Sequence, residues 1–277
     1  MDIIYRNNEG EIPFSGSSKG YIHITSIEGT GLIEKTRKSY NFPTIPGQST
    51  YYEKDRERVI TMSCDYEINP DISMEEIIRI LYHKGELIVS HNGVERKIAC
   101  YCQELKMGET VGKYKVFAVQ FVCDNPYFTK LEKEYYPLFN TQKNIKNGFS
   151  LPAVLSQRTN TRIIDNISYI STCPKVYVFY KGKDEIEGNV TLTNSTTATE
   201  IAFSEVPLKK GDEIIIDIKR RTVKRQDGEN LLSYLTDTSF LYNFSLVPGE
   251  NVISAVADNI DISLSIEHDI LFGEAGM

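Results

Sequence analysis

The sequence predicts a mostly β protein with one helix, divided into two domains. Its 277 residues exceed the usual size of a single domain. Isoleucine occurs 32 times and alanine 8 times, alongside 17 tyrosines and 12 phenylalanines. β-Branched and aromatic side chains suit the pleated surface of a sheet, whereas alanine favours helices. With 40% hydrophobic and 25% charged residues, the composition is that of a folded globular chain and excludes a disordered or collagen-like one.

The charge balance and the cysteines exclude several classes of protein. A formal net charge of −7 argues against generic nucleic-acid binding, because such binding draws on clustered positive charge. The N-terminus lacks the basic and apolar regions of a leader, and no window reaches the ~18 apolar residues of a membrane span. We therefore expect a soluble protein made in the cytoplasm, without membrane insertion. Five cysteines, an odd number, favour reduced thiols over a disulfide framework.

Short strands dominate the first half of the chain. Residues 3–5 and 12–14 flank a polar turn and predict a hairpin, and residues 21–27 predict the next strand. Residues 60–68 alternate apolar and polar side chains, so one face of that strand is buried. The polar segment 35–58, which proline and glycine interrupt, is too long for an ordinary connection. A segment of this kind is usually functional or mobile.

One helix is expected, over residues 73–84. Ser73 and Glu76 have the spacing of a capping box, and Gly85 follows as a stop signal. The apolar stripe that this helix turns inward is predicted to contain Met74, Ile77, Ile78 and Leu81.

The end of the first half contains a hairpin signal and an unusual strand. The Asn92-Gly93 turn between two strand-like runs predicts a tight hairpin. Residues 116–123 are apolar on both alternating faces, so this strand is either central in the fold or has one face against another subunit. Pro126 ends the strand, and a charged, turn-rich tract follows. We place the domain boundary there, which gives domains at 1–137 and 138–277.

The second half is predicted to be a β-sandwich, because regular short strands occur without long helices. The sandwich is expected to begin at Pro174, after a tract of unusual length. Its predicted strands are residues 176–180, 189–193, 213–218, 240–246, 252–255 and 260–266.

No catalytic set, cofactor site or metal site is predicted. The four histidines are far apart in sequence, and Cys100 and Cys102 lack the second pair that a zinc site requires. The glycine spacing of residues 108–114 differs from that of a phosphate-binding loop and indicates a hairpin turn. Paired carboxylates such as Asp65 and Glu67 are interpreted as the solvent-facing residues of a strand and not as an acid/base pair.

One basic cluster occurs in the second half, around the turn at 226–228. A charged sheet edge that opposes aggregation is the first interpretation, and a phosphate or glycan contact is the second. Alternation within a hairpin divides such side chains between two faces. The cluster consists of Lys219, Arg220, Arg221, Lys224 and Arg225.

Four segments give the chain a resemblance to a known family. They are the strand that runs into Asp124-Asn125-Pro126-Tyr127-Phe128, the segment from Lys210 to Asp217, a hairpin that contains Gly228, and Leu246-Val247-Pro248-Gly249-Glu250-Asn251. Their order and spacing resemble the distal tail proteins of long-tailed bacteriophages, over nearly the whole chain.

The resemblance implies a structural hub and not an enzyme, without a cofactor. It implies a ring, usually a hexamer, at the tail tip of a phage or prophage virion, synthesised in the cytoplasm of the bacterial host. N-terminal domains would form a tail-tube-like β-barrel around a channel through which DNA passes without specific binding. C-terminal galectin-like or carbohydrate-module-like sandwiches would project outward. The sequence leaves open whether the last residues return to the first domain.

The same resemblance implies partners and an interface. The partners would be the tail tube protein, the tape measure protein and a tail-associated lysin, tail fibre or receptor-binding protein. In that family an extended arm embraces the neighbouring subunit, and residues 35–58 are the segment expected to play that part here. We therefore assign the oligomer interface, as a hypothesis, to Tyr40, Phe42, Tyr51, Tyr52, Val116, Ala118 and Val122.

Two other functions stay open from the sequence. The second-half sandwich could hold host cell-wall glycans on exposed tyrosines, although the chain has no tryptophan. A hydrolase that degrades the cell wall is the third possibility. Glycan binding by the second half would favour the carbohydrate-binding function, and turnover of wall polymers would favour the hydrolase.

Overall fold

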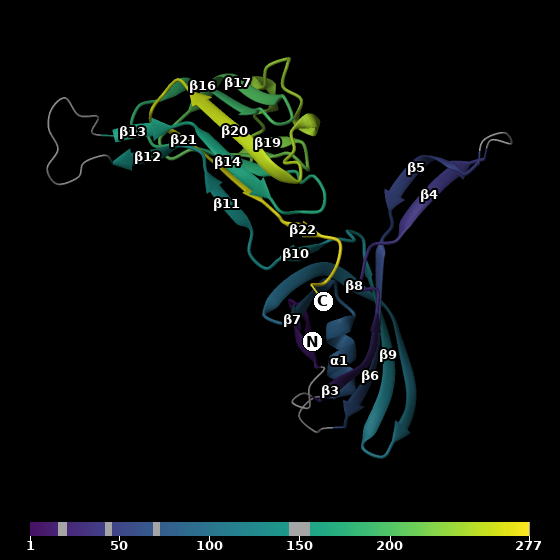
Figure 1. Cartoon of the computed structure of the whole chain (residues 1–277). Helices are drawn as coiled ribbons and strands as arrows, with labels where there is room; N and C mark the ends of the chain where they lie inside the picture. Colours follow the sequence, from purple (N-terminus) through teal and green to yellow (C-terminus); the bar gives the residue numbers. More distant parts are fainter. Residues whose placement is uncertain (16–20, 42–45, 69–72, 144–155, 277) are drawn as a thin grey trace, which may run out of the picture. The chain divides into compact units, whose positions relative to one another are not determined.

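The computed structural model describes residues 1–15, 21–41, 46–68, 73–143 and 156–276, which form two compact units (Figure 1). Unit 1 contains Met1–Leu131 and Leu271–Met277, and unit 2 contains Glu132–Ile270. Within the described residues the chain is mostly β with one α-helix, which confirms the predicted fold class. The chain passes into unit 2 before Pro137, because β11 (Glu134–Pro137) pairs with a strand of that unit. Its last residues return to unit 1.

Unit 1 is a closed barrel of seven strands. The strands follow the order β8-β7-β1-β2-β3-β6-β9, and pairing between β8 and β9 closes the circle. Neighbours are antiparallel except for β2 and β3. Two short strands, β10 (Phe128–Lys130) and β22 (Leu271–Phe272), continue the sheet beyond β8. The barrel strands are β1 (Asp2–Asn7), β2 (Gly10–Ser15), β3 (Ile22–Glu28), β6 (Arg58–Glu67), β7 (Gly85–His91), β8 (Val94–Val111) and β9 (Tyr114–Cys123).

Local sequence signals account for much of this barrel. Asn92 and Gly93 adopt φ values of 50° and 79°, the left-handed backbone that a tight hairpin turn requires. The predicted hairpin between β7 and β8 is therefore confirmed. Inside the barrel, the Phe121 ring packs against Tyr5 at 5.1 Å and against the edge of Phe14 at 6.3 Å between ring centres. These contacts join the first hairpin to β9.

The helix α1 (Met74–Leu81) is shorter than predicted, and its buried face differs. Ile77, Ile80 and Leu81 are buried, whereas Ile78 is 43% exposed. The prediction of Ile78 as an inward residue is wrong, because Ile78 lies about 100° around the helix from Ile77. Helical spacing i, i+3, i+4 connects the three residues that are buried. They cover the end of the first hairpin, where Asn7 Nδ2 donates to the carbonyl of Ile80 at 2.6 Å.

Ser73 caps this helix as predicted, since its Oγ accepts a hydrogen bond from the Glu76 amide at 3.1 Å. We expect Ser73→Ala to lower the free energy of unfolding of unit 1 by about 1 kcal/mol, because one amide of the first turn loses its partner. Ser73→Asp should retain the stability, since aspartate also caps helices. Thermal unfolding followed by circular dichroism measures both changes. Equal losses in the two variants would contradict a capping role.

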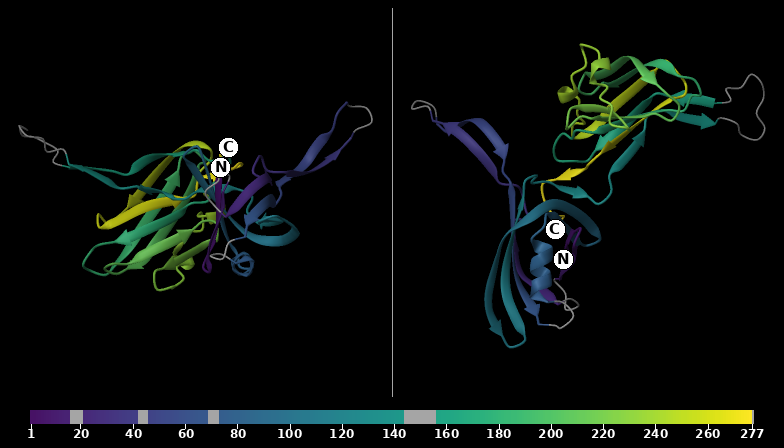
Figure 2. Two further views of the ribbon diagram at one scale, coloured as in Figure 1. Left: turned by 90° about the horizontal axis from the view of Figure 1, so that it is seen from below. Right: turned by 180° about the vertical axis from the view of Figure 1, so that it is seen from behind.

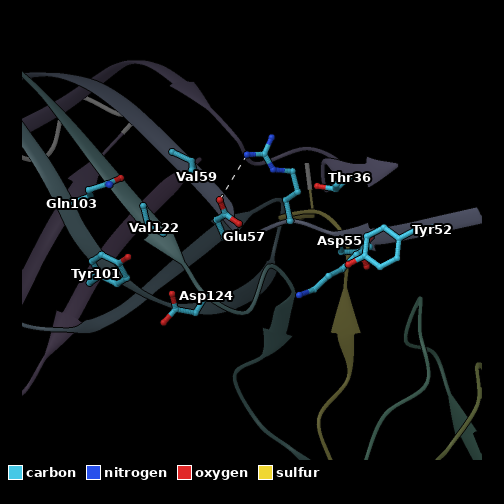
Figure 3. Close-up of a pocket in the computed structure, with 11 residues that line it drawn as sticks. Thr36, Tyr52, Asp55, Glu57, Val59, Tyr101, Gln103, Val122 and Asp124 are labelled. Carbon is cyan, nitrogen blue, oxygen red and sulfur yellow. Dashed lines mark ion pairs between the residues drawn. The ribbon is translucent and has the colours of Figure 1, made fainter. Parts of the chain in front are cut away.

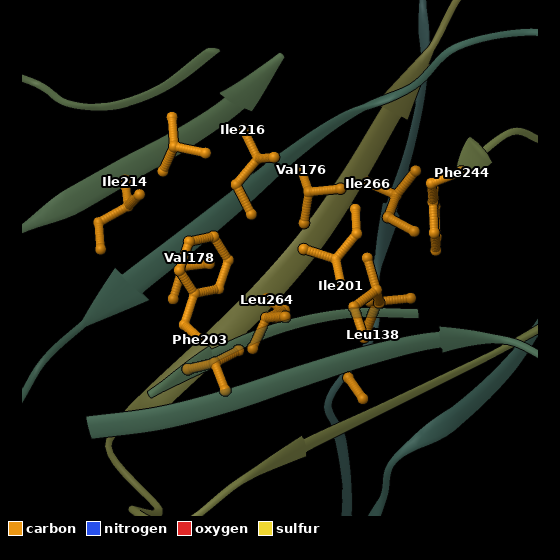
Figure 4. Packing of buried hydrophobic residues seen from close by; sticks show 14 of the residues in the cluster. Leu138, Val176, Val178, Ile201, Phe203, Ile214, Ile216, Phe244, Leu264 and Ile266 are labelled. Atoms are coloured by element: carbon orange, nitrogen blue, oxygen red, sulfur yellow. The ribbon is translucent and has the colours of Figure 1, made fainter. Parts of the chain in front are cut away.

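Unit 2 is a β-sandwich, as predicted, with its core between two sheets (Figure 4). The five-stranded sheet has the order β11-β21-β15-β18-β19, and the four-stranded sheet has the order β14-β20-β16-β17. Figure 4 shows Val176, Ile216 and Leu264 of one sheet facing Ile201 and Phe203 of the other. The strands beyond β11 are β14 (Thr161–Asn166), β15 (Lys175–Tyr180), β16 (Ile186–Asn194), β17 (Thr199–Leu208), β18 (Glu213–Asp217), β19 (Thr222–Arg225), β20 (Gly249–Ala257) and β21 (Ile262–His268).

Two predictions about unit 2 are wrong. The segment 240–246 is not a strand but contains the short 3-10 helix η2 (Leu241–Asn243), like η1 (Leu232–Tyr234) before it. The sandwich also starts earlier than Pro174, because β11 and β14 belong to its two sheets. The tract of unusual length before Pro174 thus supplies the edge strand β14. A separate pair, β12 (Asn140–Lys143) and β13 (Ser156–Thr159), lies beside it in sequence.

Candidate assembly surface

The segment between β3 and β6 forms an arm of two paired strands, β4 (Lys35–Tyr40) and β5 (Ser49–Asp55). Every residue of β4 is exposed, and so is every residue of β5 except Asp55. No other described strand pairs with the arm (Figure 2). Isolated two-stranded hairpins are marginally stable in water. The arm thus exposes backbone and side chains without a core of its own.

The two faces of the arm carry different side chains. On one face Glu53 accepts from Lys35 at 2.5 Å and lies 2.9 Å from Arg37. On the other face the Lys38 ammonium lies 5.5 Å from the centre of the Tyr52 ring. Tyr51 is the extra residue of a bulge opposite Lys38 and Ser39, and its ring lies beside that of Tyr40 with centres 5.8 Å apart. The tyrosines give the arm apolar area that its own chain leaves exposed.

The ion pairs of the arm predict a pH dependence. The hydrogen bond from Lys35 lowers the pKa of Glu53, and the same bond raises the pKa of Lys35. Because the pKa of Glu53 is lower in the folded arm than the unfolded value of about 4.3, its ionisation stabilises the paired arm above that pH. This stabilisation is lost as the pH falls through the lower pKa of the folded arm. We therefore expect the protection of amides in β4 and β5, measured against the exchange rate of unfolded peptide at the same pH, to fall below about pH 4. Hydrogen exchange from pH 6 to 3 measures this protection, and Glu53→Gln should remove its pH dependence.

The base of the arm is anchored to unit 1 beside a hollow of about 650 Å³ (Figure 3). The Tyr127 hydroxyl donates to Asp55, and the Arg56 amide donates to the Glu34 carbonyl at 2.9 Å. Burial and the Asp55 carboxylate raise the pKa of Tyr127, which keeps this hydroxyl protonated as a donor. The hollow is lined by arm residues and by the outer side of β6, β8 and β9, including Tyr52, Lys54, Val59, Tyr101 and Val122.

The sequence-predicted interface residues lie in two places. Tyr40, Tyr51 and Tyr52 are 45%, 65% and 43% exposed on the arm, whereas Phe42 lies outside the described residues. Val116, Ala118 and Val122 lie on the outer side of β9, because Phe117, Val119, Phe121 and Cys123 are buried inside the barrel. Val116 is 37% exposed and Ala118 is half-buried. Val122 is only 7% exposed, so it has little surface left for a partner.

One exposed apolar pair was missed from the sequence. Tyr82, which caps α1, is 85% exposed, and Ile78 one turn earlier is 43% exposed. Residues four apart lie on one side of a helix. The i, i+4 spacing of Ile78 and Tyr82 is the sequence signal that both lie on one side of the helix, just as the same spacing places Ile77 and Leu81 together.

The residues considered for chemistry have structural contacts. Glu67, one of the paired carboxylates, accepts from Lys113 at 2.5 Å. Residues 108–114 span the β8–β9 hairpin, with Gly112 at a φ of 61°. Within the described ranges, no three His, Cys, Asp or Glu side chains group as a metal site. In the same part of the chain, no helix has the length and hydropathy that a membrane crossing requires.

Comparison with known proteins supports the family resemblance. Residues 172–267 match the family described as "Siphovirus-type tail component, C-terminal domain". No curated protein matches the chain. The crystal structure of the Dit protein (gp 19.1) of phage SPP1, described as a paradigm of hub adsorption apparatus in Gram-positive infecting phages, aligns with a TM-score of 0.66. That alignment has 10% identity and covers 97% of this chain and 98% of that one.

Two structures of the phage P2 baseplate in its activated conformation also align. The calcium form gives a TM-score of 0.50 at 11% identity, and the strontium form gives 0.51 at 12% identity. Each alignment covers 96% of this chain and 97% of the other. The chain has the fold of these proteins, and the match to the tail-component family model lies within its sandwich. The predicted resemblance to distal tail proteins is confirmed at that level.

Proposed function

We propose that this protein is a structural component of a phage or prophage tail tip, a hub between the tail tube and the baseplate or host-adsorption apparatus. Six copies form a ring around a channel that DNA crosses. The tail tube protein, the tape measure protein and a lysin, fibre or receptor-binding protein are its partners. The site of action is the virion tail tip, after synthesis in the host cytoplasm. No catalytic step is part of this function.

The observation that carries the proposal is the arm. A two-stranded ribbon with exposed tyrosines and no core needs another surface to hold its structure. A neighbouring copy offers such a surface at every position of a ring, because closed symmetry repeats one interface. The net charge of −7 per copy suits a channel for DNA, since an acidic wall does not retain phosphates.

Native mass spectrometry of the full chain tests the proposal. We expect a hexamer, and we expect Tyr51→Ser with Tyr52→Ser to shift the protein to monomers, because the arm loses its apolar contacts. The matched control is Tyr169→Ser with Tyr242→Ser, which removes two exposed tyrosines of unit 2 that are 54% and 62% exposed. A wild-type monomer at every concentration, or equal effects of the two double variants, would contradict the proposed ring.

A further inference from the structure

The outer side of the five-stranded sheet in unit 2 carries an aromatic strip. Side chains that alternate with the buried core residues of β15 and β11 point outward, and among them are Tyr135, Tyr177 and Phe179. The Tyr177 and Phe179 rings are 14° from parallel with centres 6.2 Å apart, and Tyr135 lies 6.4 Å from Tyr177. We call these three residues the outer strip. Flat aromatic faces of this kind bind apolar faces of ligands while their hydroxyls remain polar.

A charged cleft of about 410 Å³ adjoins the outer strip. Glu267 connects the two, because its carboxylate accepts from the Tyr177 hydroxyl at 2.8 Å and from Lys133 at 2.6 Å. Lys175 precedes Tyr177 by two residues on the same strand and therefore lies on the same face. The cleft, which we call the cationic cleft, is lined by Lys133, Lys175, Asp217, Lys219, Arg220 and Glu267, with Asp269 at its side.

The ion pairs of the cationic cleft leave positive charge in surplus. Asp217 lies 3.8 Å from the Lys175 ammonium and 3.9 Å from the Arg220 guanidinium, beyond hydrogen-bond distance. Lys219 is a further cation on the exposed turn, so four cationic side chains face three carboxylates. This surplus lies in a chain whose net charge is −7, so the cleft has the opposite sign to the molecule. An anionic group fits it by charge.

The structure divides the basic cluster identified in the sequence, but not by strand alternation, because residues 219–221 lie in the turn between β18 and β19. Lys219 and Arg220 line the cleft, whereas the Arg221 guanidinium lies 6.0 Å from the Tyr242 ring centre. Arg225 is buried, and it donates to Asp212 at 2.8 Å and to the Pro207 carbonyl at 2.9 Å. Only part of the cluster is thus available to a ligand. The charged-edge interpretation leaves the contact of Lys219 and Arg220 with the cleft unexplained.

We propose that the outer strip and the cationic cleft together bind a sugar that carries an anionic group. The sugar ring lies against Tyr177, which adjoins the cleft through Glu267, and its phosphate or carboxylate reaches Lys219 and Arg220. The two parts have the complementary chemistry of such a ligand, namely apolar ring face, hydroxyls and one anion. This binding is independent of the proposed ring, since every contact residue belongs to unit 2.

Isothermal titration of the full-length protein tests the site with four probes: glucose 6-phosphate, glucuronate, glucose and inorganic phosphate. We expect one of the two anionic sugars to bind at least about tenfold more tightly than glucose or phosphate, and the better one identifies the anion. Weak binding of phosphate alone, with no gain from the sugar, would show an unspecific charge effect and overturn the proposal. The assembly state is read separately by native mass spectrometry, so the two proposals fail independently.

Matched variants locate the binding. Lys219→Gln with Arg220→Gln should reduce affinity for the anionic sugar by about tenfold, since both residues are exposed and replaceable without loss of the core. Lys209→Gln with Lys210→Gln removes the same charge from a turn outside the cleft and should leave affinity unchanged. Tyr177→Leu should lower the affinity for the anionic sugar and leave the affinity for inorganic phosphate unchanged. Equal affinity in the two charge variants would overturn the assignment.

Discussion

Replacing Arg58 by methionine should lower the free energy of unfolding of unit 1 by about 3–5 kcal/mol. Arg58 begins β6 and is only 4% exposed. Its guanidinium donates to four backbone carbonyls at 2.6–2.7 Å, those of Gly29, Gly31, Pro126 and Gly273. Methionine fills a similar volume but donates nothing, so four carbonyls lose their partner, and the bonds to Pro126 and Gly273 are lost in a buried place.

The local backbone is built for this contact. Gly29 has a φ of 86°, and a Cβ there would lie 1.9 Å from the Val59 carbonyl oxygen, so only glycine fits beside Arg58. Urea unfolding followed by circular dichroism, with hydrogen exchange in β6, measures the effect. The control is Arg6→Met, because Arg6 is exposed and forms a surface ion pair with Glu11. A loss for Arg58→Met no larger than that of the control would contradict the account.

Deleting residues 271–277 should destabilise unit 1 by about 4 kcal/mol and leave unit 2 unchanged. β22 pairs with β10, and the Phe272 ring, 7% exposed, lies 3.7 Å below the Arg96 guanidinium. Arg96 also pairs with Glu274, and the Ala275 amide donates to the Thr30 carbonyl at 3.0 Å. The deletion removes these contacts together with one acceptor of Arg58.

Hydrogen exchange resolved by segment measures the deletion. Protection should fall in β6, β8 and β10 of unit 1, while β15 and β20 of unit 2 serve as the internal control. The deletion begins after Ile270, so the sandwich core keeps all its residues. Uniform loss of protection in both units, or no loss in either, would contradict a role limited to unit 1.

Local signals in the sequence were sufficient for part of the fold. Turn chemistry at Asn92-Gly93 and the cap at Ser73 depend on neighbours in the chain, and both predictions are confirmed. The error at Ile78 arose because an apolar residue beside the inward stripe looks the same in sequence whether or not its side is covered. The segment 240–246 alternates apolar and polar side chains like a strand, but it belongs to neither sheet of unit 2 and contains the 3-10 helix η2.

Long-range features were harder to derive. The four acceptors of Arg58 come from three distant segments, and no spacing in the sequence connects them. The arm was recognised as unusual by its length, yet its pairing of β4 with β5 was not predicted. Alternation places Val122 on the outer side of β9, but it does not reveal that this residue, which lines the hollow at the base of the arm, is only 7% exposed.

Electron microscopy of the purified full-length protein in negative stain tests the central claim most directly. The account predicts hollow rings with six repeats around the hole, and their loss in the Tyr51→Ser, Tyr52→Ser variant. Compact single particles without a hole at every concentration, in a protein whose arm is intact, would contradict it.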